Sequence, residues 1–213
     1  MNNIYLQLTR EFNRDGTRAI LAGGQAVVLH RLAIMSKDGD WILREDRETV
    51  EHVLTILERY GARYRFGAPL DVRWLAGGWS AHLEFQWQEM RVRTDFITRP
   101  PRLDQEALQR IWHDVEGQEI PFLGAMDLAA MKKTNREKDY AVIGELARRM
   151  TDVDSQILYS RSARDLLDLA EQHPERVRHL VERRPALAAL DQGREALERS
   201  EEHTSELQSH HPI

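Results

Sequence analysis

The stretch GGQAVVLHRLAIMSKDGD, residues 23–40, contains the signals that decide the fold. A short apolar run at 18–22 precedes the two glycines and predicts a buried strand that closes on a tight turn. Residues 25–32 then predict a helix, and residues 38–43 predict a second strand that begins on polar side chains. The order of strand, glycine turn, helix and strand indicates a core that contains both helices and strands.

Hydrophobic periodicity extends this core on both sides. Apolar residues at helical spacing predict a helix at 47–60, and the apolar residues of 3–13, at mixed spacing and followed by Asp15-Gly16, predict a first helix. Beyond residue 80 the period falls to two, and residues 82–87 and 90–97 predict two strands joined as a hairpin. We therefore expect an α/β (α+β) fold over residues 1–100, in which a small mixed sheet is flanked by helices.

The C-terminal half has mainly helical patterns, and we expect a helical region over 101–198. The patterns lie at residues 104–113, 125–133, 136–150 and 160–171. Between the first two, Gly117 to Leu123 predicts a short strand or an extended link. The final stretch, RSEEHTSELQSHHPI at 199–213, resembles the translation of a sequencing-adapter oligonucleotide. We expect a non-native, disordered tail there and leave it out of the fold.

The composition limits the class of protein. Of 213 residues, 41% are hydrophobic and 31% are charged, which indicates a globular chain rather than a disordered one. Cysteine is absent, which excludes a disulfide scaffold, a cysteine-type zinc finger and thiol catalysis. No apolar run is long enough to span a membrane and the N-terminus lacks a signal-peptide pattern, so we expect a cytoplasmic protein with no membrane partner. The net charge of −5 argues against general nucleic-acid coating.

Three carboxylates stand out by position. Asp38 and Asp40 point to the same side of the strand that they begin, and they repel each other unless a cation lies between them. Asp95 lies on the polar face of its strand, with Arg91 and Arg93. If the two strands are neighbours, the three acids converge and can hold two magnesium ions for phosphoryl transfer. Asp-Gly-Asp is also an ordinary turn sequence, and a calcium loop fails for lack of further oxygen ligands at loop spacing.

Two further segments support phosphate binding. Gly23 and Gly24 lie between a strand and a helix, where backbone amides can approach a phosphate. Their spacing is not that of a P-loop or a Rossmann fingerprint, and a tight turn is the alternative. The segment 127–139 gathers cations that suit triphosphate oxygens, although a solvated helix face explains them equally well. These cations are Lys132, Lys133, Arg136 and Lys138.

Taken together, these segments resemble the nucleotidyltransferase superfamily with its polymerase-beta-like fold. The resemblance is to the small bacterial nucleotidyltransferase-like proteins related to abortive-infection and toxin–antitoxin enzymes. The family pattern runs from Gly-Gly through a helix with a His near its end to Arg-x-Thr-x-Asp-x-Asp. In this chain His30, Asp38 and Asp40 fall at that spacing, and Asp95 matches the family's third carboxylate. The later family motif of a Lys followed by a basic-acid couple maps onto Lys132 or Lys133, Arg136, Lys138 and Asp139.

The resemblance implies a metal-dependent enzyme that moves a nucleoside monophosphate from an NTP to a hydroxyl of RNA or protein. Asp38, Asp40 and Asp95 would be the catalytic residues and the ligands of two Mg²⁺ or Mn²⁺ ions. The implied nucleotide-binding residues are Gly23, Gly24, Ser36, Lys132, Lys133, Arg136, Lys138 and Asp139.

The alternative is a catalytically inactive module of the same fold, which binds a nucleotide or acts as an antitoxin-like partner protein. Two departures from the family pattern favour it: Ile34 stands where the family usually has Arg, and Gly39 where it has an apolar residue. Ser36 in place of Thr is a mild change, and Val142 lies where an acid often follows the Lys-Asp couple.

Two other observations have structural explanations that are more common than the functional ones. His30 matches the motif, yet histidines of this kind usually stabilise a core edge. Trp74, Trp79 and Trp87 lie in or beside the predicted sheet and could stack on a base, whereas aromatic residues in strands usually pack a core.

Overall fold

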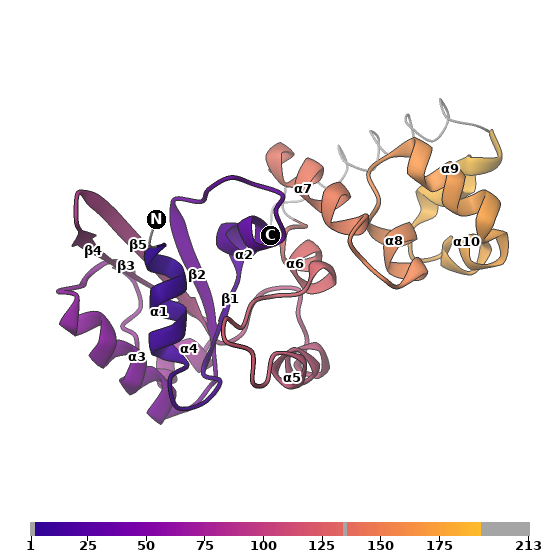
Figure 1. Cartoon of the computed structure of the whole chain (residues 1–213). Helices are drawn as coiled ribbons and strands as arrows, with labels where there is room; N and C mark the ends of the chain where they lie inside the picture. Colours follow the sequence, from indigo (N-terminus) through magenta and orange to yellow (C-terminus); the bar gives the residue numbers. More distant parts are fainter. Residues whose placement is uncertain (1–2, 134–135, 193–213) are drawn as a thin grey trace. The chain divides into compact units, whose positions relative to one another are not determined.

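The computed structural model describes residues 3–133 and 136–192, without the side chains of residues 137, 138, 191 and 192 (Figure 1). It confirms the expected fold class: a five-stranded mixed sheet flanked by helices is followed by a helical C-terminal region. The chain divides into two compact units between Met131 and Lys132. None of the helices in the described part is long and apolar enough to cross a membrane.

The sheet has the strand order β1-β2-β5-β4-β3. The central pair, β2 and β5, is parallel, and the other neighbours are antiparallel. The hairpin of β4 and β5 is present, as predicted. The strands are β1 Ala19–Leu21, β2 Asp38–Leu43, β3 Arg63–Gly67, β4 Ala81–Trp87 and β5 Met90–Ile97.

The helices of the first unit begin and end at sequence signals. The Asp46 carboxylate caps α3 by accepting a hydrogen bond from the Thr49 backbone amide at 2.7 Å, and Gly61 follows the helix with φ at +69°. The sheet ends at Ile97, and α5 and α6 follow within the same unit. The helices are α1 Ile4–Phe12, α2 Gly23–Leu29, α3 Arg47–Arg59, α4 Val72–Ala76, α5 Gln105–Asp114 and α6 Ala125–Met131.

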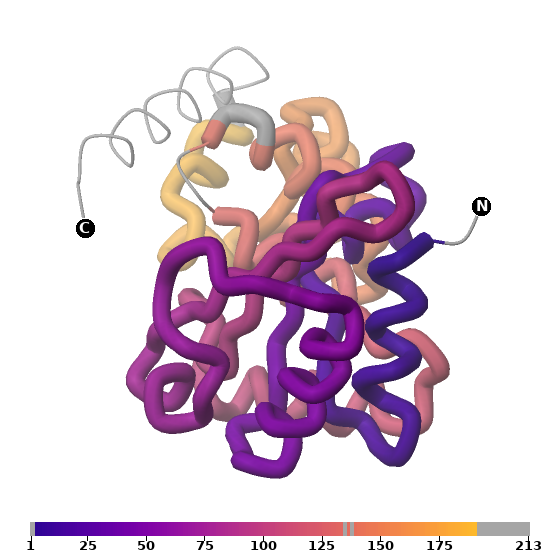
Figure 2. Tube along the Cα trace, turned by 90° about the vertical axis from the view of Figure 1, so that its left-hand side faces the viewer, coloured from indigo at the N-terminus to yellow at the C-terminus, as the bar shows by residue number. Residues whose placement is uncertain are grey.

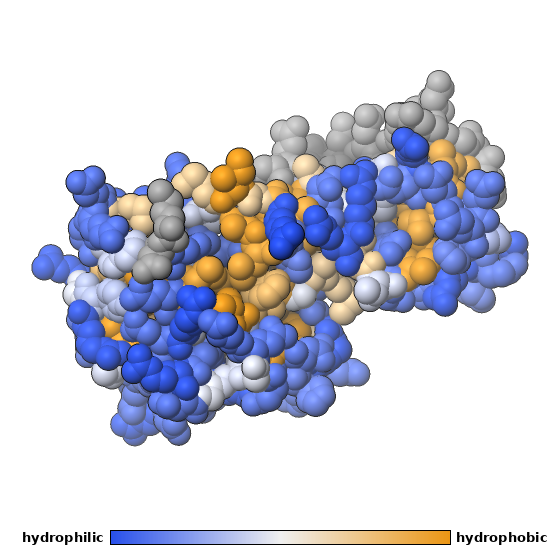
Figure 3. Space-filling model, viewed as in Figure 1, coloured by the Kyte–Doolittle hydropathy of each residue, from blue (hydrophilic) through white to orange (hydrophobic). Residues whose placement is uncertain are grey.

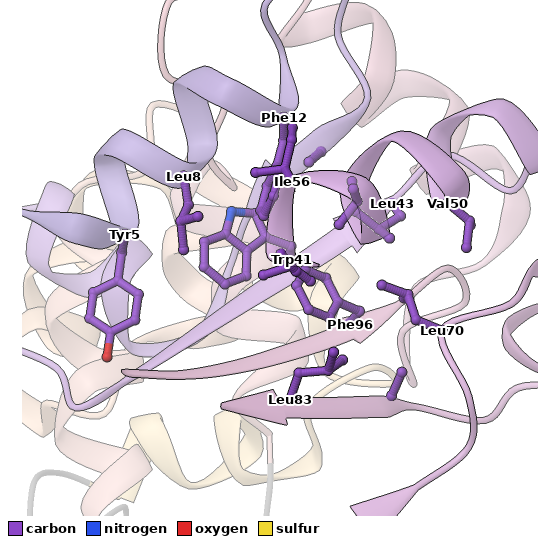
Figure 4. Packing of buried hydrophobic residues seen from close by; sticks show 14 of the residues in the cluster. Tyr5, Leu8, Phe12, Trp41, Leu43, Val50, Ile56, Leu70, Leu83 and Phe96 are labelled. Atoms are coloured by element: carbon purple, nitrogen blue, oxygen red, sulfur yellow. The ribbon is translucent and has the colours of Figure 1, made fainter. Parts of the chain in front are cut away.

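One face of the sheet forms the main hydrophobic core with α1 and α3. Figures 1 and 2 show α1 lying alongside the sheet, and Figure 4 shows its apolar residues pointing into the core. Trp41 is fully buried there, with its ring stacked on Phe96 at 5.5 Å and edge-on to Phe12 at 5.4 Å. Its indole N–H donates to the Thr9 hydroxyl at 3.0 Å, so its polar atom is satisfied inside the core.

Alternate residues of β2 point to the opposite face of the sheet. Ile42 is fully buried on that face, whereas Asp38 and Asp40, nearer the start of the strand, are only half-buried. The same face therefore changes from polar to apolar along the strand, and its polar end contains the predicted carboxylates.

The second unit is helical, as predicted, with its own core. Its elements are α7 Glu137–Ala147, α8 Val153–Tyr159, α9 Ala163–Gln172, α10 Pro174–Leu180 and a 3₁₀ helix at Pro185–Gln192. The core side chains are Ile157, Leu166, Val177, Leu180, Leu187 and Leu190. The predicted tail at 199–213 lies outside the described residues.

Candidate functional site

A row of four side chains crosses four neighbouring strands on the polar face of the sheet. Asp40 of β2 pairs with Asp95 of β5, Asp95 pairs with His82 of β4, and His82 pairs with Phe66 of β3. We call these four residues the cross-strand row. Neighbouring strands lie about 4.8 Å apart, so consecutive members of the row are within reach of one another.

Asp38 lies beside this row, two residues before Asp40 on the same face of β2. The condition set for the three acids to converge, that the strand of Asp95 neighbours the strand of Asp38 and Asp40, is met. Asp38 lies opposite Arg93, with 3.6 Å between its Oδ1 and Arg93 Nη1. Within the described part of the chain that oxygen is buried and makes no hydrogen bond.

Asp95 has two partners that the sequence analysis did not find. His82 Nδ1 lies 2.7 Å from Asp95 Oδ1, and Arg65 Nη1 lies 3.6 Å from the same oxygen. An ionised carboxylate only accepts, so Nδ1 carries the proton and donates it. The other ring nitrogen, Nε2, lies 2.8 Å from the Ser80 hydroxyl oxygen. Both nitrogens of His82 are thus held, and Asp95 is oriented by a fixed donor.

A β-bulge in β3 explains how Arg65 reaches Asp95. Tyr64 pairs with Leu83 and Phe66 pairs with His82, so β3 has one residue more than β4 over this step. The extra residue is Arg65, and its side chain joins that of Phe66 on the polar face. Arg65 Nε lies 3.4 Å from Glu84 Oε2, which adds a second carboxylate to its surroundings.

Gly23 and Gly24 leave the space that two site residues, Asp40 and Ser36, occupy. Gly23 has φ at +54°, and a Cβ built on it would lie 1.8 Å from Asp40 Oδ2. A Cβ on Gly24 would lie 2.2 Å from the Ser36 hydroxyl oxygen. The start of α2 therefore lies directly against Asp40 and Ser36, which no other residue type at these positions allows.

Gly39, a departure from the family pattern, also has a packing reason. A Cβ there would lie 2.4 Å from the Trp41 ring and 2.5 Å from the Tyr5 ring. The Tyr5 hydroxyl donates to the Lys37 carbonyl at 2.6 Å. Burial raises the pKa of Tyr5, and the charges of Asp38 and Asp40 raise it further, so the phenol stays protonated as a donor. The aromatic rings take the space that an apolar side chain at position 39 would fill.

His30 and the tryptophans have structural surroundings. His30 Nε2 lies 2.9 Å from the Leu123 carbonyl oxygen, and its ring is edge-on to Phe122 at 5.2 Å. Trp87 packs against the main core, while Trp74 and Trp79 are partly exposed and in edge contact with each other. Ile34 is 98% exposed in the loop between α2 and β2, and Figure 3 shows apolar atoms gathered at the top of the first unit, where this loop lies.

The predicted cations of 127–139 belong to the second unit, and the three whose side chains are described have partners there. The Asp139 carboxylate, almost fully buried, lies 3.4 Å from Lys132 Nζ and 2.8 Å from Arg136 Nε. The ammonium group of Lys133 lies 4.4 Å from the centre of the Tyr159 ring. The side chain of Lys138 lies outside the described residues. Asp139 thus anchors an ion-pair cluster in the second unit.

The carboxylates of the polar face fit a hard divalent cation by chemistry. Their oxygens are the donors that Mg²⁺ and Mn²⁺ prefer, and the buried, unbonded oxygen of Asp38 is available as a ligand. Among the described residues, however, no three His, Asp or Glu side chains stand together as a ready-made metal site. Arg65 and Arg93 face Asp95 and Asp38 instead. A bound cation would therefore take over a charge-balancing role that the two arginines now have.

None of the protein-family models matches the chain. Comparisons with curated proteins and with solved structures also found no match.

Proposed function

We propose that the chain is a metal-dependent nucleotidyltransferase, which moves a nucleoside monophosphate from an NTP to an RNA or protein hydroxyl. The observation that carries the proposal is the register of β2 and β5, which pairs Asp40 with Asp95 and places Asp38 on the same face. Three carboxylates on one face of two adjacent parallel strands supply the type of oxygen ligand that two-metal phosphoryl transfer uses.

In the proposed reaction the acceptor hydroxyl oxygen attacks the α-phosphorus of the NTP. The new P–O bond forms as the bond from the α-phosphorus to the bridging β-oxygen breaks, and pyrophosphate leaves. Asp95 takes the hydroxyl proton. When bound, Mg²⁺ or Mn²⁺ supplies charge neutralisation at the phosphate oxygens. Asp38 and Asp40 hold the cations, and the backbone at Gly23 and Gly24 binds the β- and γ-phosphates.

His82 supports Asp95 in this role. It donates to one oxygen of Asp95 and leaves the other oxygen for the cation or the proton. Because the Ser80 hydroxyl fixes the far side of the imidazole, Asp95 keeps one orientation before the substrate arrives.

The alternative function is an inactive nucleotide-binding module or antitoxin-like partner protein. Arg65 and Arg93 favour it, because they already neutralise two of the three acids without any metal. In this alternative the arginines keep the polar face folded and no phosphoryl transfer takes place.

The deciding experiment incubates the protein with each α-labelled NTP, Mg²⁺ or Mn²⁺, and either total RNA or total protein. We expect covalent label on one acceptor class with release of pyrophosphate, and at least a 100-fold loss in Asp40→Asn and Asp95→Asn. Asp15→Asn changes an exposed acid in the turn after α1, outside the cross-strand row; it is the control and should keep full activity. If the wild-type protein transfers no label under any of these conditions, the inactive module becomes the better explanation.

A further inference from the structure

Phe66 is an exposed aromatic side chain, and one face of its ring packs against another side chain of the sheet. It is 58% exposed, although it belongs to a strand of the sheet. Its ring is stacked on the His82 ring, with 4.3 Å between the centres and 27° between the planes. The Arg65 guanidinium carbon lies 4.9 Å from the centre of the same ring. The exposed Phe66 ring, stacked on His82 and with the Arg65 guanidinium held over it, is what we call the stacking platform.

The platform is rigid before any ligand binds. His82, on which Phe66 rests, is held at both ring nitrogens by Ser80 and Asp95. Arg65 is placed by the bulge and paired with Glu84 and Asp95. A bulge of this kind re-aims side chains, and here it turns two consecutive side chains toward the polar face. Little conformational entropy remains to be lost when a planar group stacks on Phe66.

The order of residues along the cross-strand row indicates which substrate, the NTP or the acceptor, lies near the stacking platform. Asp40 lies next to Gly23 at one end, Asp95 follows, and Phe66 lies two strand spacings beyond Asp95, about 10 Å away. In-line transfer places the attacking oxygen on the side of the phosphorus opposite the leaving pyrophosphate. With Asp95 taking the proton, the acceptor enters from the Phe66 end of the row.

We infer that the acceptor is the terminal nucleoside of a single-stranded RNA, whose base stacks on Phe66. Proteins commonly hold an unpaired base by stacking it on an aromatic side chain, and Phe66 is the exposed aromatic side chain of the cross-strand row. A serine or threonine acceptor carries no planar group that would use this surface. The inference rests on the proposed function for the position of the reaction, and it narrows the acceptor to one of the two classes.

Binding of RNA tests the platform separately from transfer. Fluorescence anisotropy with 5′-fluorescein-labelled single-stranded RNA 12-mers in Mg²⁺, without NTP, should show about tenfold weaker binding in Phe66→Leu. Phe66→Trp should restore the affinity. The control is Tyr64→Leu, which removes another exposed aromatic side chain, on the opposite face of the same strand, and should change the affinity less than twofold. Equal affinity of the wild type and Phe66→Leu would overturn the inference.

Transfer kinetics then separate this inference from the proposed function. We expect Phe66→Leu to raise KM for the RNA about tenfold and to leave KM for the NTP unchanged. A raised KM for the NTP alone would place the donor base on Phe66 and overturn the inference. Transfer to a protein hydroxyl that is insensitive to Phe66→Leu would also overturn it, while the proposed function would stand.

Discussion

The carboxylate of Asp40 occupies the space that a side chain at Gly23 would need. The contact joins the start of α2 to the centre of the polar face, because a Cβ on Gly23 would lie within 1.8 Å of Asp40 Oδ2. Any residue other than glycine must displace Asp40 and adopt φ at +54°. The glycine turn and the proposed metal ligand therefore form one structural unit.

Replacing Gly23 with alanine tests this contact. Gly61→Ala has similar left-handed strain with open space around the new methyl group, so we expect it to cost about 1–2 kcal/mol. Gly23→Ala should cost about 2 kcal/mol more, because the methyl group also displaces Asp40. Urea unfolding of both variants measures the difference. Equal losses would show that the Asp40 contact contributes nothing to stability.

The effect of Mg²⁺ on thermal stability reports on Asp40 as a ligand. The wild type should melt higher with Mg²⁺ and an NTP, because a ligand that binds only the native state stabilises it. Asp40→Asn should lose that increase, yet melt no lower than the wild type in EDTA, because one of three neighbouring like charges is gone. Thermal melts of the two proteins in the two conditions suffice. If Asp40→Asn keeps the full increase, Asp40 is not a ligand.

Gly39→Val restores an apolar residue at the position where the resembling family has one. We expect a loss of about 3 kcal/mol, because the Tyr5 and Trp41 rings occupy the site and the core repacks poorly around larger side chains. The double variant Gly39→Val with Tyr5→Leu should recover part of this loss. Chemical unfolding of the single and double variants measures the coupling, and strictly additive losses would contradict it.

The ion-pair cluster around Asp139 should stabilise the second unit. Asp139→Ala leaves Lys132 without this buried partner, and we expect the free energy of unfolding to fall by about 2–3 kcal/mol. This loss is smaller than that for a fully buried ion pair because the second partner of Asp139, Arg136, is exposed. Asp154→Ala, which breaks an exposed pair with Arg176, should cost less than about 1 kcal/mol. All five tryptophans lie in residues 1–131, so circular dichroism should show an early loss that tryptophan fluorescence does not. Coincident transitions would contradict this local effect.

Glu45 makes stability depend on acid pH. Hydrogen bonds from Arg99 and then Thr98 lower the pKa of the Glu45 carboxyl. A lowered pKa in the folded state means that the interaction stabilises the protein above the unfolded pKa of about 4.3 and is lost as pH falls through the folded value. Glu45→Gln should therefore be less stable than the wild type at pH 7 and equal to it near pH 2. Urea unfolding at several pH values, with exposed Glu58→Gln as the control, measures this. A stability gap that does not change with pH would count against it.

The strands with a clear apolar pattern could be predicted from the sequence, whereas the edge strand β3 could not. The strand at 38–43 has a polar start and an apolar end, and the structure places β2 there with the same bounds. β3 went unpredicted because four of its five residues are exposed and its bulge breaks the period of two. The short helices α4, α8 and α10 offer too few turns for a periodic signal.

The acids of the site could be predicted from alternation alone, but their partners depend on register. His82 had a usable signal: the two-residue turn Gln88-Glu89 pairs Trp87 with Met90, and counting back along the hairpin places His82 opposite Asp95. Arg65 had none, because its position depends on a bulge in a strand whose pairing follows only from the folded sheet.

The bulge that turns Arg65 toward Asp95 also affects how β3 meets other molecules. β3 lies at one edge of the sheet, and no further strand of the described residues pairs with its outer side. Such an edge can recruit a strand from another copy of the chain. A bulge and the charged side chains of Arg63 and Arg65 make β3 a poor template for that pairing. Straightening β3 by deleting Arg65 would therefore cost the protein its resistance to aggregation as well as its contact with Asp95.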